Sequence, residues 1–269
     1  MTKADKKYAV ITGGSSGLGF AFSKELAKDG YVPILIARRK NKLDEAVADI
    51  KRLGYEAYSF ECDIASEENL TRVCKIIKDE FGAINLLLLN AGVVNVGLLA
   101  DYNDFSKMNE DIRIDLWGTI LAARIFLPLL KPKSKIIMIS SAFGLIGGAG
   151  YTTYCAAKAG VINFAEALRR ELLCKDISVH VACPADIDTP QYEYETKNSP
   201  DWMLGASAGR KSLLAPEKAA RRILKKCKGK RFLIIINSEI ALLLFLHRIL
   251  PRRVVDFILD GSLPRPKIN

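Results

Sequence analysis

The chain has 269 residues, of which 49% are hydrophobic and 26% are charged. These values are close to a globular average and exclude disordered, collagen-like and low-complexity classes. The length fits one large α/β domain. The formal net charge of +10 is unusual and suggests an anionic partner, which is a nucleic acid, a membrane surface or a small molecule.

The excess of positive charge is confined to one C-terminal segment. Residues 1–208 contain 25 basic and 26 acidic side chains, whereas residues 209–253 contain 13 basic and 2 acidic ones. The body of the chain is therefore nearly neutral. An extended anionic surface is expected to meet the segment 209–253.

Cysteine and histidine are too few and too scattered for a metal site. The 6 cysteines form no CxxC pair, and the only histidines are His180 and His247. This pattern predicts neither bound zinc nor a His-dependent catalytic triad. We expect reduced cysteines that serve as packing residues in a reducing compartment. No apolar run precedes the first predicted strand, so we expect no secretory signal and a cytoplasmic protein.

Short β-branched runs alternate with helical patterns from residue 7 to about 183. The predicted strands are Tyr8–Thr12, Pro33–Ala37, Glu56–Glu61, Ile84–Asn90, Lys135–Ser140 and Ile177–Cys183. The predicted helices between them include Phe20–Asp29, Lys42–Leu53, Glu67–Phe81 and Tyr154–Cys174. Nearly continuous apolar strands indicate a parallel sheet that is buried on both faces. We therefore predict an α/β fold, a Rossmann-type doubly wound parallel sheet of about seven strands.

The pattern changes beyond residue 184. Pro184–Lys211 is rich in Asp, Glu, Thr, Pro and Tyr and has no clear period. The later elements are predicted at Pro216–Lys228 (helix), Phe232–Ile236 (strand) and Glu239–Leu250 (apolar helix). We predict a single nucleotide-binding domain over 1–236, which includes a substrate lid at about 186–212. An apolar and basic helical extension covers 237–269.

The first predicted strand leads into the glycine-rich turn Thr12–Gly19, TGGSSGLG, and a helix follows. Glycine allows tight backbone conformations and lets the main chain approach a pyrophosphate. The N-terminus of the helix offers free N–H groups and a partial positive charge to phosphates. The alternative is an ordinary glycine-rich turn, but its place directly after the first strand favours a dinucleotide site.

The end of the second predicted strand indicates which dinucleotide is bound. It reads Ala37-Arg38-Arg39-Lys40. A carboxylate there would bind the ribose 2′-hydroxyl of NAD, whereas Arg38 suits the 2′-phosphate of NADP. We predict NADP(H), with a solvated basic loop as the alternative, and we treat Arg39 and Lys40 as surface residues.

A proton-transfer group is predicted on the helix that begins near residue 154. Tyr154 and Lys158 lie four residues apart and share a helix face. A free tyrosine has a pKa of about 10, and a nearby ammonium together with an oxidised nicotinamide ring would lower it. Ser141, thirteen residues earlier at the end of a strand, could hydrogen-bond a substrate carbonyl. We predict these three residues to be catalytic.

Together these motifs resemble the short-chain dehydrogenases/reductases over roughly residues 6–236. The matching pieces are Thr12–Gly19, Cys62-Asp63, Asn90-Ala91-Gly92, Ser141, Tyr154-xxx-Lys158 and the stretch that begins at Pro184. The resemblance implies hydride transfer between a nicotinamide and a carbonyl or alcohol. Tyr154 would be the acid, Lys158 would bind the nicotinamide ribose and tune the tyrosine, and Ser141 would polarise the carbonyl.

The same resemblance implies cofactor contacts and an oligomer. Asp63 would contact the adenine, Asn90 would shape the cofactor floor, and Thr189 would lie near the carboxamide and phosphate. The expected contacts are Gly13, Ser15, Ser16, Gly17, Leu18, Gly19, Arg38, Asp63, Asn90, Gly92, Tyr154, Lys158, Pro184, Ile187 and Thr189. A homodimer or homotetramer would be built on the helices around 104–131 and 154–174.

Two positions depart from the family pattern. The family usually has Asn where Asp115 stands, and that Asn supports a water in a proton relay. Asp115 has the same shape and could still hold a water, but it adds negative charge and cannot donate when ionised; we include it among the catalytic candidates. The usual Pro-Gly after the sixth strand is Pro184-Ala185 here, which restricts the backbone.

The stretch Pro184–Glu195 is similar to the 3-ketosphinganine reductases of this family, which reduce a long-chain amino ketone with NADPH at a membrane face. Four carboxylates in or beside it could attract a substrate ammonium, and the alternative is a solvated acidic loop; they are Asp186, Asp188, Glu193 and Glu195. Our best prediction is therefore an NADPH-dependent reductase of a hydrophobic ketone, 3-ketosphinganine. The alternatives are a 3-oxoacyl, steroid or other hydrophobic-ketone reductase, or a weakly catalytic dinucleotide-binding protein at a membrane.

The C-terminal tail combines apolar and basic residues. Its longest apolar run, Ile240–Leu246, has 7 residues, whereas a spanning helix needs roughly 20. An apolar helix beside Arg248, Arg252 and Arg253 suits a helix lying in an anionic membrane interface. The alternative is a helix that covers the sheet edge or a subunit interface. No nucleic-acid-binding pattern accompanies the charge, so we expect peripheral binding to the cytoplasmic face of a membrane.

Overall fold

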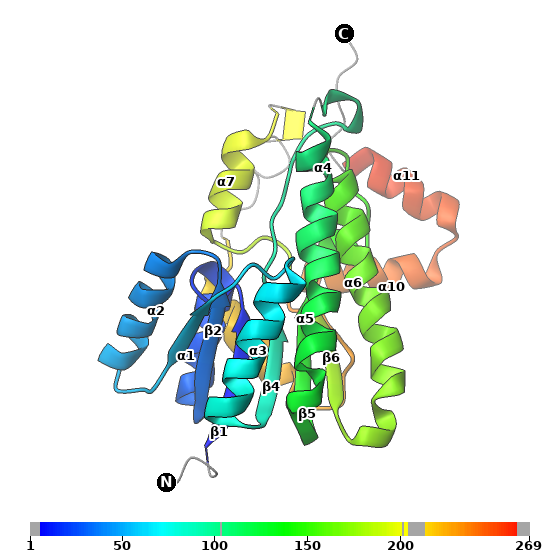
Figure 1. Cartoon of the computed structure of the whole chain (residues 1–269). Coiled ribbons are helices and arrows are strands. Elements are labelled where there is room, and N and C mark those ends of the chain that lie inside the picture. Colours follow the sequence, from blue (N-terminus) through cyan, green and yellow to red (C-terminus); the bar gives the residue numbers. More distant parts are fainter. Residues whose placement is uncertain (1–5, 103, 201, 204–212, 263–269) are drawn as a thin grey trace.

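A seven-stranded parallel sheet forms the centre of the molecule (Figure 1), with strand order β3-β2-β1-β4-β5-β6-β7. The computed structural model describes residues 6–102, 104–200, 202–203 and 213–262. The strands are β1 (Lys7–Thr12), β2 (Tyr31–Ala37), β3 (Tyr58–Glu61), β4 (Ile84–Leu89), β5 (Leu130–Ile139), β6 (Ser178–Ala182) and β7 (Leu233–Ile234). The order reverses between β1 and β4, and in open α/β sheets ligands bind at such a switch point.

Helices cover both faces of the sheet, as the continuous apolar strands predict. They are α1 (Gly17–Lys28), α2 (Lys40–Arg52), α3 (Glu67–Phe81), α4 (Phe105–Asp111), α5 (Gly118–Phe126), α6 (Thr152–Glu171), α7 (Pro190–Asn198), α9 (Pro216–Lys226), α10 (Ser238–Ile249) and α11 (Arg252–Ser262). One core cluster joins the sheet to α3, α5 and α6, and others join it to α1, α2 and α9. The predicted fold class is confirmed.

The predicted elements recur with small shifts at their ends. Glu67–Phe81 matches α3 at both ends, and β4 ends at Leu89. Strand β5 begins five residues earlier than predicted, at Leu130. The reason is an irregularity in the β4–β5 pairing between Ile84 and Leu86, near Lys133 with its left-handed φ of 69°. A local irregularity of this kind leaves no periodic signal in the sequence.

Helix α7, which lies beyond residue 184, was not predicted. Helix α7 interrupts the stretch that was expected to be irregular. Thr189 caps it, because its Oγ1 accepts a hydrogen bond from Tyr192 N at 3.3 Å, and Pro190 occupies its first turn. This capping chemistry starts a helix even where the composition is polar. Helix α11 follows α10 within the predicted helical extension 237–269.

Part of the basic excess is paired inside the fold. Helix α9 packs against α1, where Arg221 lies 3.0 Å from Glu25 and Lys24 lies 2.7 Å from Glu217. Lys228 lies 3.2 Å from Asp29. Two of the C-terminal basic residues, Arg221 and Lys228, therefore have acidic partners in the chain itself, which was not foreseen.

Helix α10 contains no fully buried residue, and its half-buried residues include Ile240, Leu243 and Leu244. In Figure 1, α10 and α11 form an arm beside the body. Over the described part of the chain, no helix is long and apolar enough to span a membrane. Residues 201 and 204–212 of the predicted lid, 209–212 of the basic segment and 263–269 of the extension lie outside the described residues.

The six cysteines are all unpaired. Within the described ranges, no group of three or more His, Cys, Asp or Glu side chains could hold a metal ion.

Candidate active site

A cleft of about 600 Å³ opens at the carboxyl ends of the strands. Its walls come from the segments that follow β1, β2, β4, β5 and β6 and from α6 and α7. Every predicted cofactor contact lines it, and so does Ser141. Asp115 does not line the cleft; it is buried and touches the cleft residue Lys158.

The glycine turn after β1 is packed so closely that side chains would not fit. Gly13 has a φ of +67°, and a Cβ there would lie 2.9 Å from the Cα of Ala91. A Cβ on Gly19 would lie 2.1 Å from the carbonyl oxygen of Gly13. Ser16 precedes α1 in an extended conformation and makes no side-chain cap, which leaves the first N–H groups of α1 for another acceptor. This cradle fits the pyrophosphate of a dinucleotide.

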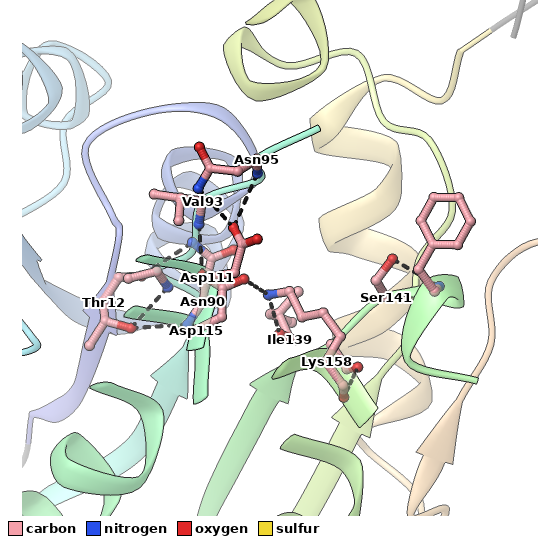
Figure 2. Close-up of polar contacts among 12 residues, drawn as sticks. Thr12, Asn90, Val93, Asn95, Asp111, Asp115, Ile139, Ser141 and Lys158 are labelled. Carbon is pink, nitrogen blue, oxygen red and sulfur yellow. Dashed lines mark hydrogen bonds and ion pairs between the residues drawn. The ribbon is translucent and has the colours of Figure 1, made fainter. Parts of the chain in front are cut away.

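Thr12 ties the glycine turn to the loop after β4 (Figure 2). Its Oγ1 accepts hydrogen bonds from Asn90 N at 3.0 Å and from Ala91 N at 3.2 Å, and Asn90 Nδ2 donates to Thr12 O at 3.2 Å. Asn90 thus fixes the floor of the cleft. The structural role of Thr12 was missed, because only the fold brings β1 and β4 side by side.

Two arginines follow β2 at the cleft. Arg38 and Arg39 are exposed and both line it, and Arg39 Nη2 lies 3.4 Å from Ser16 Oγ. Arg39 is thus a surface residue, as expected, but one that also reaches the phosphate-binding turn. Lys40, by contrast, pairs with Asp44 at 3.0 Å. Asp63 lines the cleft as well, and its Oδ1 accepts a hydrogen bond from Ala65 N at 3.0 Å.

Tyr154 is almost fully enclosed, with 8% of its surface exposed. Burial raises its pKa to about 12, although the charge of Lys158 and a hydrogen bond with Ser141 act to lower it. Lys158 Nζ lies 5.4 Å from the centre of the tyrosine ring. The expectation that Lys158 lowers this pKa is therefore correct in its sign, but the effect of burial is larger.

Asp115 contacts Lys158 directly rather than through a water. It lies in a π-helical segment (Ile112–Trp117) between α4 and α5, a geometry often found at functional sites. Its Oδ1 accepts a hydrogen bond from Val93 N at 2.8 Å, and its Oδ2 forms an ion pair with Lys158 Nζ at 2.9 Å (Figure 2). Burial raises the pKa of Asp115. Burial alone would lower the pKa of Lys158, but the charges of Asp115 and Tyr154 raise it.

A second buried carboxylate, Asp111, was missed. Its Oδ1 accepts hydrogen bonds from Asn95 N and Asn95 Nδ2, both at 3.1 Å, and its Oδ2 accepts one from Thr153 Oγ1 at 2.7 Å. Burial raises its pKa to about 6. Asp111 thus connects the loop after β4 to the residue next to Tyr154. The available signal was its position four residues before Asp115.

The opposite wall of the cleft carries acidic and aromatic side chains. Of the four carboxylates considered, Asp186 and Glu195 line the cleft, whereas Asp188 and Glu193 are exposed and do not. The hydroxyl of Tyr151, a residue that was not predicted, donates a hydrogen bond to Glu195. Only two of the four acidic residues are therefore placed to meet a substrate.

Comparison with known proteins agrees with this geometry. The sequence model of the short chain dehydrogenase family matches residues 7–199. The chain is 31% identical to the 11-beta-hydroxysteroid dehydrogenase-like 2 protein of Arabidopsis thaliana over 94% of this chain and 80% of that one. It is also 31% identical to a 3-dehydrosphinganine reductase of the same plant, over 87% of this chain and 72% of that one.

Among solved structures, the fold matches a short chain dehydrogenase/reductase from Burkholderia phymatum in complex with NAD, with a TM-score of 0.81 and 23% identity over the whole of both chains. The sheet, the glycine cradle and the family match agree with one another. The chain belongs to the short-chain dehydrogenase family of oxidoreductases, whose fold binds a nicotinamide dinucleotide.

Proposed function

We propose that this protein is an NADPH-dependent reductase that transfers hydride to the ketone of a long-chain, lipid-like substrate, with 3-ketosphinganine as the best candidate. The observation that carries the proposal is the placement of Ser141, Tyr154 and Lys158 in one cleft beside the glycine cradle. A reduced nicotinamide, when bound, supplies the hydride. The chain supplies the proton, the orientation of the carbonyl and a site shielded from water.

Tyr154 is the proposed acid. Its pKa of about 12 keeps the phenol protonated at neutral pH. As the carbonyl carbon gains hydride, the carbonyl oxygen gains negative charge and takes the phenolic proton. The Ser141 hydroxyl donates a hydrogen bond to the same oxygen. The Lys158 ammonium, which Asp115 keeps charged at 2.9 Å, stabilises the tyrosinate that remains.

The preference for NADPH is proposed from the two arginines after β2. Guanidinium groups bind phosphate through paired, charge-assisted hydrogen bonds. Arg38 and Arg39 both line the cleft next to the phosphate-binding turn. Together they would hold the 2′-phosphate, while Asp63 would meet the adenine and Thr189 the carboxamide end.

The proposed substrate class rests on the lining of the cleft around Tyr154. Val94, Phe143 and Tyr154 line the cleft and belong to one apolar cluster, in which Tyr151, Met203 and Trp202 pack against them without lining the cleft. Such a wall suits an alkyl chain or another apolar body. The relatives named above include a 3-dehydrosphinganine reductase and a steroid-dehydrogenase-like protein, which is consistent with a hydrophobic ketone.

The test is NADPH oxidation with purified protein and a panel of ketones: 3-ketosphinganine, a 3-oxoacyl thioester and a steroid ketone. We expect the highest kcat/KM with 3-ketosphinganine. A higher kcat/KM with another ketone would change the assigned substrate but would still support the proposed reductase activity. A lack of turnover with the whole panel would contradict the proposed function.

We also propose that the arm formed by α10 and α11 binds an anionic membrane surface. Its exposed apolar residues include Phe245, 58% exposed, and Phe257, 81% exposed. Arg248, Arg252 and Arg253 are exposed beside them. Apolar burial in the headgroup region and attraction between arginine and anionic lipid would act together.

Liposome sedimentation tests this second proposal. The double variant Phe245→Ser/Phe257→Ser should lose binding to vesicles that contain anionic lipid. Leu53→Ser, which removes an apolar residue of the body that is 55% exposed, close to the value for Phe245, should retain it. Equal binding of both variants would contradict a membrane role for the arm.

A homodimer or homotetramer through the helices around 104–131 and 154–174 remains our proposal. These helices leave Phe105 and Trp117 exposed, which suits a contact between copies. Light scattering coupled to gel filtration should give a dimer or tetramer, and a monomer would contradict the proposal.

A further inference from the structure

The charged residues of the cleft are divided between its two ends. Arg38 and Arg39 lie at the phosphate-binding turn, and Asp186 and Glu195 lie on the β6–α7 side. The other charged residues of the described ranges that line the cleft are Asp63, Glu110 and Lys158. Asp63 lies 3.7 Å from Arg113, and Lys158 pairs with Asp115. Among the described residues, the end of the cleft next to α7 thus carries two carboxylates, Asp186 and Glu195, while the opposite end carries two guanidinium groups, Arg38 and Arg39.

Glu195 is held in place by a buried aromatic residue, Tyr151, that packs beside the cleft. The hydroxyl of Tyr151 donates a hydrogen bond to its carboxylate. Tyr151 stacks on Phe143 with ring centres 4.5 Å apart, and its ring centre lies 6.4 Å from that of Tyr154. A carboxylate whose position is fixed beside aromatic rings is a setting that binds organic cations.

Within the described residues, no basic side chain forms an ion pair with Glu195. Burial raises the pKa of Glu195, and the nearby charge of Asp186 raises it further. The hydrogen bond from Tyr151 acts in the opposite direction and lowers this pKa. The charge of Glu195 also acts on Tyr154 and raises the pKa of that phenol. A cation bound beside Glu195 would neutralise the negative charge of its carboxylate. It would also lie close to the reacting carbonyl.

We infer that Glu195, with Tyr151, forms a subsite for an ammonium group carried by the substrate next to its ketone. The inference rests on the proposed ketone reduction at Tyr154 and adds the residue that would recognise the amine of the proposed amino-ketone substrate. The ammonium donates to the Glu195 carboxylate, the ketone oxygen meets Ser141 and Tyr154, and the apolar chain lies along Val94 and Phe143. Glu195 thereby selects the substrate and orients its carbonyl.

The test compares two substrates that differ only in charge. One is a long-chain 2-amino-3-ketone, and the other is the same ketone with hydrogen in place of the amine. The wild-type protein should prefer the amino ketone in kcat/KM. Glu195→Gln keeps the shape and an acceptor for Tyr151 but removes the charge. It should lower the ratio of the two kcat/KM values by roughly 10- to 100-fold, the usual cost of losing a hydrogen bond to a charged group.

Glu193→Gln is the matched control, because Glu193 lies on the same helix but is exposed and does not line the cleft. It should leave the ratio unchanged. An equal loss on both ketones in Glu195→Gln would overturn the inference, because it would make Glu195 only a structural link between α7 and Tyr151. A wild-type protein that reduces both ketones equally well would also overturn it and would leave the proposed reductase standing. Reduction of neither ketone would instead contradict the proposed function.

Discussion

The two sides of the cleft are built differently. The cofactor side is held by the sheet: Thr12 and Asn90 join the ends of β1 and β4, and a Cβ on Gly19 would collide with the backbone. The substrate side includes α7, which contains no buried residue and is linked to the body by the contact of Tyr151 with Glu195. The first side has little freedom to change. The second can vary without disturbing the core, so substrate specificity is expected to be determined there.

The largest expected effect is a loss of activity on changing Tyr154, which lies where the cofactor side and the substrate side of the cleft meet. Tyr154→Phe removes the proton donor but keeps the ring that packs in the apolar cluster. We expect kcat to fall by roughly 100- to 10,000-fold, the range for loss of a positioned acid. Steady-state NADPH oxidation measures it, with the thermal midpoint as a check on folding. Turnover close to that of the wild type would exclude Tyr154 as the acid.

A methyl group at Gly19 tests the rigidity of the cofactor side. Because its Cβ would lie 2.1 Å from Gly13 O, Gly19→Ala should distort the cradle and weaken NADPH binding by roughly 10- to 100-fold, the scale of overpacking costs. Gly147→Ala is the control, since no atom lies within 4 Å of a Cβ there. Fluorescence titration with NADPH compares the two. Equal affinities would mean that the cradle tolerates change.

Removal of a guanidinium changes the choice of cofactor without moving the backbone. Arg38→Ala and Arg39→Ala should each weaken NADPH relative to NADH by roughly tenfold, as expected for one lost charge-assisted contact. Lys40→Ala should have no such effect, because Lys40 pairs with Asp44. The ratio of kcat/KM values for the two cofactors reports the change. Equal losses with both cofactors would contradict the 2′-phosphate assignment.

The smallest expected effect is a shift in a pH profile. The negative charge of Asp115 raises the pKa values of Tyr154 and Lys158. Reduction needs protonated Tyr154, so activity falls as the pH rises through its pKa. Asp115→Asn lowers that pKa and should move the alkaline limb of the kcat profile to lower pH. Glu171→Gln, at an exposed position, serves as the control. An unmoved limb would show that Asp115 has no electrostatic role.

The sheet and the glycine turn could be predicted because their signals are local. Apolar runs such as Ile84–Leu89 indicate a buried strand, and the spacing of Gly13, Gly17 and Gly19 reflects a backbone requirement. The contact of Asp111 with Asn95 and Thr153 could not be predicted, since it joins three segments that only the fold brings together.

The electrostatics of the site also depend on packing. A sequence shows that Tyr154 and Lys158 are neighbours, but the raised pKa of Tyr154 follows from its burial. In the same way, the charge pattern showed a basic C-terminal segment but not that Arg221 of α9 would pair with Glu25 of α1. The sequence shows which side chains are charged, and the tertiary structure determines which of them are paired within the chain and which remain free to bind a partner.

The most direct test of the central claim follows the hydride itself. The wild-type protein is incubated with 3-ketosphinganine and NADPH deuterated at C4 of the nicotinamide, prepared as both stereoisomers, and the product is analysed by mass spectrometry. The account predicts an alcohol that carries deuterium at the former carbonyl carbon from one stereoisomer and none from the other. Recovery of the ketone unchanged from both reactions, or an alcohol that contains no deuterium from either isomer, would contradict it.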